Sequence, residues 1–142
     1  MANALRTIYR HDYRPPPVRV ETVDLRIELG VDSTRVQARL DCAVSADGSP
    51  VRLDARGLDL ESVAVDGRTL DPGAYRIEDD SVWLPPLPAN CVIETVSRID
   101  PDNNTALEGL YRSGGIYCTQ CEAEGFRRIT PFPDRPDVMA VY

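Results

Sequence analysis

Apolar and polar residues alternate strictly in two stretches of the N-terminal half. In residues 23–29 Val, Leu and Ile are separated by charged side chains, and in residues 36–44 an apolar side chain occupies every other position. A period of two places successive side chains on opposite faces of a β-strand, so each stretch predicts a strand with one buried face. The short loop of residues 30–34 between them predicts an antiparallel hairpin.

Shorter alternating segments follow at residues 51–55, 58–65, 75–77, 82–84 and 91–96. Asp66-Gly67 and Asp79-Asp80 separate some of them and predict tight hairpin turns, because these residue types tolerate a positive φ. No window of eleven residues shows sustained helical periodicity. The pattern predicts an all-β fold, an antiparallel-rich β-sandwich or saddle-shaped sheet, with at most short helical turns.

One short helical start is predicted after the last of these strands. Thr105 and Glu108 have the T-x-x-E spacing of a capping box, in which the two side chains satisfy backbone N–H groups at a helix start. Gly109, Gly114 and Gly115 limit this element to one or two turns.

Length and charge narrow the function classes. The 142 residues suit a single domain. Lys and Arg number 16 against 23 Asp and Glu, and this acidic balance argues against a nucleic-acid partner. No stretch reaches the roughly 20 apolar residues of a membrane helix, so no membrane partner is expected. The first residues lack the apolar core of a secretory signal, which predicts a cytoplasmic protein with reduced cysteines.

The Cys118-x-x-Cys121 spacing raises the question of a metal or redox site. Structural zinc requires four ligands, and Cys42, Cys91 and His11 provide no matching second pair. Residues three apart on a strand point to opposite faces, and no helix in a βαβ setting is predicted for a redox motif. We expect ordinary thiols and no metal bound by this chain.

Residues 116–123 predict a further strand, on which Cys118, Gln120 and Glu122 share one face. A carboxylate beside an amide carbonyl suits an α-ammonium group, because both oxygens accept hydrogen bonds and the carboxylate supplies the opposite charge. Spacing alone is nevertheless more typical of a solvated strand face.

Three consecutive sequence blocks near the C-terminus favour the binding interpretation of Gln120 and Glu122 over that of a solvated strand face. TALEGLY, CTQCEAEGFR and DRPDV within residues 105–142, together with YRHDYRPP at residues 9–16, resemble the N-terminal domain of bacterial aminopeptidase N, a zinc-dependent family. The resemblance implies that Gln120 and Glu122 contact the free amino group of peptide substrates. It also implies that the H-E-x-x-H zinc motif lies beyond residue 142, so that the full-length enzyme holds zinc and this chain holds no catalytic residue.

The resemblance implies that residues 1–142 form one N-terminal β domain whose partner is the catalytic domain of the same polypeptide, which is absent here. It leaves open whether the domain ends at Tyr142 or is truncated there. Pro131-Phe132-Pro133 departs from the family and fixes the local chain path. The alternative is a free-standing β-sandwich module that binds protein or carbohydrate. An H-E-x-x-H motif in the reading frame after Tyr142 distinguishes the two.

We predict that purified residues 1–142 bind no stoichiometric zinc and hydrolyse no aminoacyl substrate, because the chain offers too few ligands for a metal with an open position. Metal analysis after dialysis, alongside a chromogenic aminoacyl assay, measures both properties. One tightly bound zinc per chain, or turnover that a chelator abolishes, contradicts the prediction.

Overall fold

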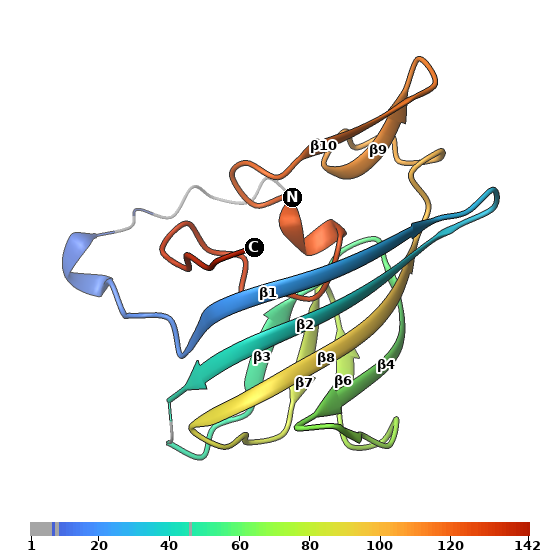
Figure 1. The fold of residues 1–142 in the computed structure, drawn as a ribbon. Coiled ribbons are helices and arrows are strands. Elements are labelled where there is room, and N and C mark those ends of the chain that lie inside the picture. Colours follow the sequence, from blue (N-terminus) through green and yellow to red (C-terminus); the bar gives the residue numbers. More distant parts are fainter. Residues whose placement is uncertain (1–6, 8, 46) are drawn as a thin grey trace.

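A computed structural model describes residues 7, 9–45 and 47–142 of the chain. These residues form ten β-strands and two 3₁₀-helices of three residues each, η1 (Arg10–Asp12) and η2 (Phe126–Arg128). Every pair of neighbouring strands runs antiparallel, so the predicted all-β fold is confirmed (Figure 1). No helix in the described ranges has the length and apolar character needed to cross a membrane.

The larger sheet has five strands in the order β1-β2-β8-β4-β5. Its first two strands form the predicted hairpin, with Leu29 opposite Thr34 and Val18 opposite Val44. The predicted turn at Asp66-Gly67 also exists, with φ values of 49° and 76°. The bounds are β1 (Val18–Leu29), β2 (Thr34–Val44), β8 (Asn90–Ile99), β4 (Asp59–Val65) and β5 (Arg68–Thr69).

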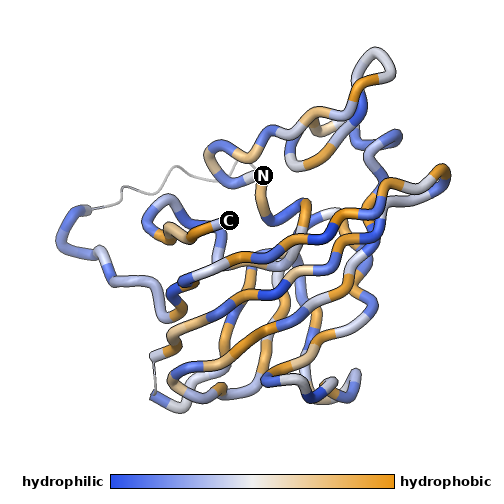
Figure 2. Tube along the Cα trace, in the orientation of Figure 1, coloured by the Kyte–Doolittle hydropathy of each residue, from blue (hydrophilic) through white to orange (hydrophobic). Residues whose placement is uncertain are grey.

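A three-stranded sheet, in the order β3-β7-β6, lies behind the larger one (Figure 1). It comprises β3 (Val51–Asp54), β7 (Ser81–Leu84) and β6 (Arg76–Glu78). The turn between β6 and β7 contains Asp79 at a φ of 50°, which confirms the second predicted hairpin. Apolar and polar residues alternate along the strands of both sheets, as the colours of Figure 2 show.

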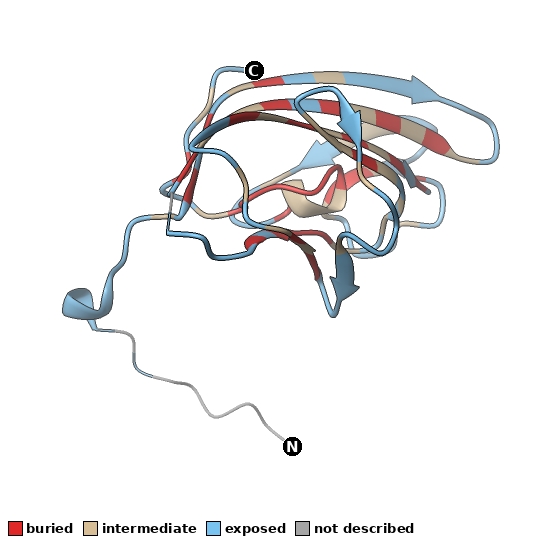
Figure 3. Cartoon of the chain, turned by 90° about the horizontal axis from the view of Figure 1, so that it is seen from below, coloured by how far each residue is buried: buried red, intermediate tan, exposed pale blue. Residues whose placement is uncertain are grey.

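The main core fills the space between the two sheets. Buried positions on the larger sheet face buried positions on the smaller one (Figure 3). Leu40 and Ile93 come from the first, and Leu53, Val82 and Leu84 from the second, each with no more than 1% of its surface exposed. Burial of this apolar surface is the dominant favourable contribution to folding.

The far end of β1 departs from the expected burial. Ile27 and Leu29 are 39% and 53% exposed, because this end of the hairpin extends beyond the main core (Figure 1). β1 is also an edge strand of its sheet, and it has a bulge between Val20 and Thr22. The C-terminal segment pairs with β1 next to this bulge, where the Val23 N–H donates to the Val141 carbonyl at 2.8 Å.

A third, two-stranded sheet stands apart from the sandwich at the top of Figure 1. It is the hairpin of β9 (Gly109–Ser113) and β10 (Ile116–Gln120). Isolated hairpins are marginally stable, so this one depends on its packing against the rest of the molecule. A second buried cluster supplies that packing, and its members are Val36, Ile99, Leu110 and Ile129.

We predict that Leu40→Ala lowers the free energy of unfolding by about 2–5 kcal/mol, because it leaves a cavity between the sheets. Ile77→Ala on β6 is the control, since this side chain is 61% exposed; it should change stability by no more than about 0.5 kcal/mol. Urea unfolding measures both values, and similar losses for the two variants would place the core elsewhere.

Candidate functional site

The strand that carries the candidate residues is shorter than its sequence predicts. β10 ends at Gln120, which lies opposite Gly109 of β9, and the prediction of a strand continuing to Ala123 is wrong. The chain turns instead, and the Gly125 N–H donates to the Cys121 carbonyl at 2.9 Å. A Cβ on Gly125 would lie 2.6 Å from the Gln120 carbonyl oxygen, so only glycine permits this close return of the chain.

The early end of β10 changes how the two predicted binding residues are presented. Strand alternation does not place Glu122 on the face of Gln120, because Gln120 is the last strand residue and Glu122 lies in the turn that follows. Both side chains are exposed, and the peptide bond after Glu122 is cis. Tyr117 and Cys121 pack instead against the second buried cluster. The amide and the carboxylate therefore sit at a strand end and its adjoining turn.

The other carboxylates near this turn are paired with arginines. Arg128 Nε donates to Glu108 Oε2 at 2.9 Å, and Arg127 Nη2 lies 3.2 Å from Glu124 Oε2. Among the described residues, neither Gln120 nor Glu122 has a side-chain hydrogen-bond or ion-pair partner. Glu122 is thus the carboxylate of this turn that stays available to a ligand. Glu124, in contrast, is engaged by its arginine partner.

Arg127, one of the two arginines of η2, is an internal residue of the domain. Arg127 and Arg128 both pair with carboxylates, and the Arg127 side chain is only 11% exposed, so it is not a surface group. Its main partner, Asp134, is buried as well. Spacing within the sequence gives no signal for this contact, because it depends on where the chain passes after η2.

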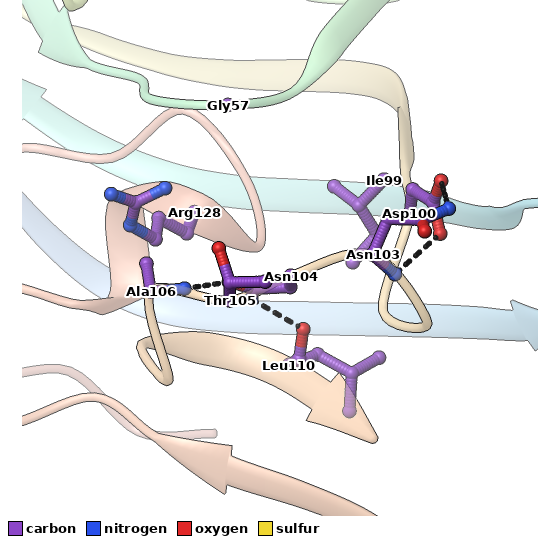
Figure 4. A pocket seen from close by; sticks show the side chains of 9 residues that line it. All are labelled: Gly57, Ile99, Asp100, Asn103, Asn104, Thr105, Ala106, Leu110 and Arg128. Atoms are coloured by element: carbon purple, nitrogen blue, oxygen red, sulfur yellow. Dashed lines mark hydrogen bonds between the residues drawn. The ribbon is translucent and has the colours of Figure 1, made fainter. Parts of the chain in front are cut away.

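A hollow of about 270 Å³ lies at the loop that precedes β9 (Figure 4). Asn104 organises its wall: Nδ2 donates to the carbonyls of Glu108 and Leu110 at 2.7 and 2.9 Å, and Oδ1 accepts from the Ala106 N–H at 3.1 Å. The capping box predicted for Thr105 and Glu108 is therefore wrong. Asn104 satisfies the backbone, and Glu108 pairs with an arginine. The hollow is lined by Gly57, Ile99, Asp100, Asn103, Asn104, Thr105, Ala106, Leu110 and Arg128.

The carboxylate at the rim of this hollow is also engaged within the chain. Asp100 accepts hydrogen bonds from the Asn103 side chain at 2.7 Å and from its backbone N–H at 3.1 Å, and these bonds lower the pKa of Asp100. The polar wall of the hollow is thus occupied by bonds that fix the loop before β9.

Cys42, Cys91 and Cys121 lie in environments that disfavour the thiolate form. Burial raises the pKa of Cys42 to about 12, and it also raises the pKa values of Cys91 and Cys121. A thiol must lose its proton to act as a nucleophile or a zinc ligand, so these environments disfavour both roles. Within the described ranges, no three His, Cys, Asp or Glu side chains come together as a metal site. Zinc therefore does not fit these residues.

Comparison with known proteins identifies relatives of this chain by sequence. No protein-family model matches the chain. Aminopeptidase N of Caulobacter vibrioides is 46% identical over 132 residues, which cover 92% of this chain and 15% of the relative. Aminopeptidase N of Escherichia coli is 42% identical over 134 residues, which cover 93% of this chain and 15% of the relative.

Solved structures agree with these relatives. Legionella pneumophila aminopeptidase A has a TM-score of 0.82 and 30% identity, and the match covers 92% of this chain and 16% of that protein. An M1 zinc metallopeptidase of Deinococcus radiodurans shares the fold, with a TM-score of 0.69 at 18% identity over 87% of this chain and 31% of that one. The chain spans about 15% of the length of the curated relatives. It is a homologue of the N-terminal region of bacterial aminopeptidase N, as residues 9–16 and 105–142 indicated.

Proposed function

We propose that this chain is the N-terminal β domain of a zinc-dependent aminopeptidase, and that Gln120 and Glu122 bind the α-amino group of the substrate peptide. One observation carries the proposal. Glu122 is exposed beside a strand end without a partner in the described chain, whereas the neighbouring Glu108 and Glu124 are each matched by an arginine.

The chemistry of the two side chains suits this ligand. An α-ammonium has three N–H donors and a positive charge, and the Glu122 carboxylate offers both an acceptor and the opposite charge. The Gln120 carbonyl offers a second, neutral acceptor. A peptide bond inside a longer chain has one N–H and no charge, so it cannot replace the ammonium. This difference favours peptide N-termini over internal segments.

Two of the similar structures contain ligands consistent with this role. The Legionella pneumophila aminopeptidase A is in complex with aspartic acid, and a Deinococcus radiodurans M1 zinc metallopeptidase mutant is bound to Tyr-Ser-Ala. An amino acid and a short peptide each have an α-amino group, which is the group proposed for recognition here.

Zinc and the groups that act on the peptide carbonyl belong, in this proposal, to other parts of the same polypeptide. Residues 1–142 would bind and orient the substrate as a single domain beside a catalytic domain. We also propose a cytoplasmic location, which the free thiols of all four cysteines support.

The proposal predicts unequal losses from two substitutions in the whole polypeptide. Glu122→Gln keeps the shape but removes the charge, and should cost about 2–4 kcal/mol in transition-state binding, whereas Gln120→Ala removes a neutral acceptor and should cost about 1–2 kcal/mol. Steady-state kinetics with a free-amine substrate measure both as kcat/KM, with zinc content unchanged.

Two controls separate amine recognition from a general effect. Glu78→Gln, on β6 of the three-stranded sheet, removes an exposed carboxylate that pairs with Arg76, and it should leave kcat/KM unchanged. Inhibitors that lack an amino group should bind equally well to wild type and Glu122→Gln. Equal losses for ligands with and without the amine would show that Glu122 does not act through the amino group. Wild-type kinetics in Glu122→Gln would show that Glu122 is only a solvated turn residue.

A further inference from the structure

The guanidinium of Arg127 is largely buried in the domain, and Arg127 follows closely in the chain on the turn that carries Glu122. The turn spans residues 121–125, and Arg127 lies in η2, which follows it at once. Removing a guanidinium from water is costly unless opposite charges and hydrogen bonds replace the lost hydration. The surroundings of Arg127 therefore have to supply several acceptors.

Asp134 supplies most of them. Its Oδ2 accepts from both the backbone N–H and Nε of Arg127 at 3.0 Å, and its carbonyl oxygen accepts from Nη2 at 2.9 Å. Asp54, at the end of β3, lies 3.9 Å from Nη1. Burial works against the charge of Arg127, but these acidic neighbours outweigh it and raise the pKa of the guanidinium. The arginine is fixed at its inner side.

The inner carboxylates are themselves fixed to the sandwich. Asp54 Oδ2 accepts the Asp134 N–H at 3.1 Å, and Asp54 Oδ1 lies 2.8 Å from Arg52 Nη2. The backbones of Asp54 and Phe132 exchange two hydrogen bonds, at 2.8 and 3.0 Å. Arg127 is thus anchored, through Asp134, to a strand of the main sandwich.

The outer side of Arg127 reaches the turn. Nη2 lies 3.2 Å from Glu124 Oε2, and the Glu124 side chain is 60% exposed. One guanidinium nitrogen therefore connects a buried carbonyl to a carboxylate two residues beyond Glu122. An exposed ion pair contributes little to stability when both partners are free to move. Here the cation is already held, so the pair spends little side-chain entropy on its geometry.

We infer that Arg127 is a positioning residue that holds the turn of residues 121–125, through Glu124, so that Glu122 faces the amino group of the substrate. This role rests on the proposed amine recognition by Glu122. It assigns Arg127 no contact with the substrate. The guanidinium acts by restricting the conformations of the turn, and pre-organised acceptors bind an ammonium more tightly than mobile ones.

A double-mutant cycle in the whole polypeptide tests the inference. Arg127→Met should lower kcat/KM for a free-amine substrate about tenfold when Glu122 is present, and at most about twofold in the Glu122→Gln background. Arg127→Lys should give a kcat/KM between those of wild type and Arg127→Met, because an ammonium keeps the charge but not the forked geometry. Equal losses in both backgrounds would mean that Arg127 does not act through Glu122.

Hydrogen exchange of the same polypeptides provides a readout that does not depend on activity. Arg127→Met should accelerate exchange in the segment 121–127 about tenfold or more, because the turn opens locally. Val82→Ala, which weakens the main core at the three-stranded sheet, should show no selective effect on that segment. Unchanged exchange in Arg127→Met overturns the inference whatever the kinetics show.

Glu124→Gln covers the case in which Arg127→Met does not fold. It removes only the exposed end of the contact, and it should lower kcat/KM about threefold with faster exchange of the turn. Glu78→Gln is the matched control for loss of a surface carboxylate. If Glu122→Gln itself has wild-type kinetics, amine recognition is wrong, and the hold of Arg127 on the turn is then decided by exchange alone.

Discussion

The packing of the C-terminal segment depends on one buried carboxylate, Asp54, which links β3 to the chain that follows η2. The residue ends β3, exchanges backbone hydrogen bonds with Phe132, and accepts the Asp134 N–H through its side chain. A buried carboxylate without such partners would be strongly destabilising. Meeting this requirement draws the segment after η2 against the sandwich, and with it the turn that carries the candidate site.

The separate two-stranded sheet shows why that attachment matters. β9 and β10 belong to neither layer of the sandwich, and only a small apolar cluster around Leu110 and Ile129 packs beneath them. A hairpin on so small a core has limited stability of its own. The hydrogen bond from Arg128 of η2 to Glu108, which precedes β9, adds to this support. The candidate site thus lies on a hairpin that is stabilised by packing against neighbouring segments and not by pairing with the strands of the sandwich.

Local signals in the sequence predicted the sandwich well, because hairpins depend on residues close together. Asp66-Gly67 and Asp79-Asp80 turn where expected. The failures occur where distant residues decide: β10 stops early because the chain returns on Gly125, and Asn104 displaces the Thr105 capping box. Gln120 and Glu122 were selected by family resemblance, since their spacing alone fits any solvated strand. The contacts of Arg127 reach Asp54, far away in the sequence, and no local pattern encodes them.

The long edge strand of the larger sheet has a consequence for handling the domain in isolation. β1 offers backbone hydrogen-bonding groups along its outer side, the kind of template on which another chain can add a strand. Its exposed half carries Asp24, Arg26 and Glu28, and its inner half has a bulge at residues 20–22 and the pairing with Val141. Charges and bulges both discourage edge-to-edge association. At the opposite edge, β5 has two residues and offers little to pair with. Both margins of the sheet therefore carry features that discourage the addition of a strand from another chain.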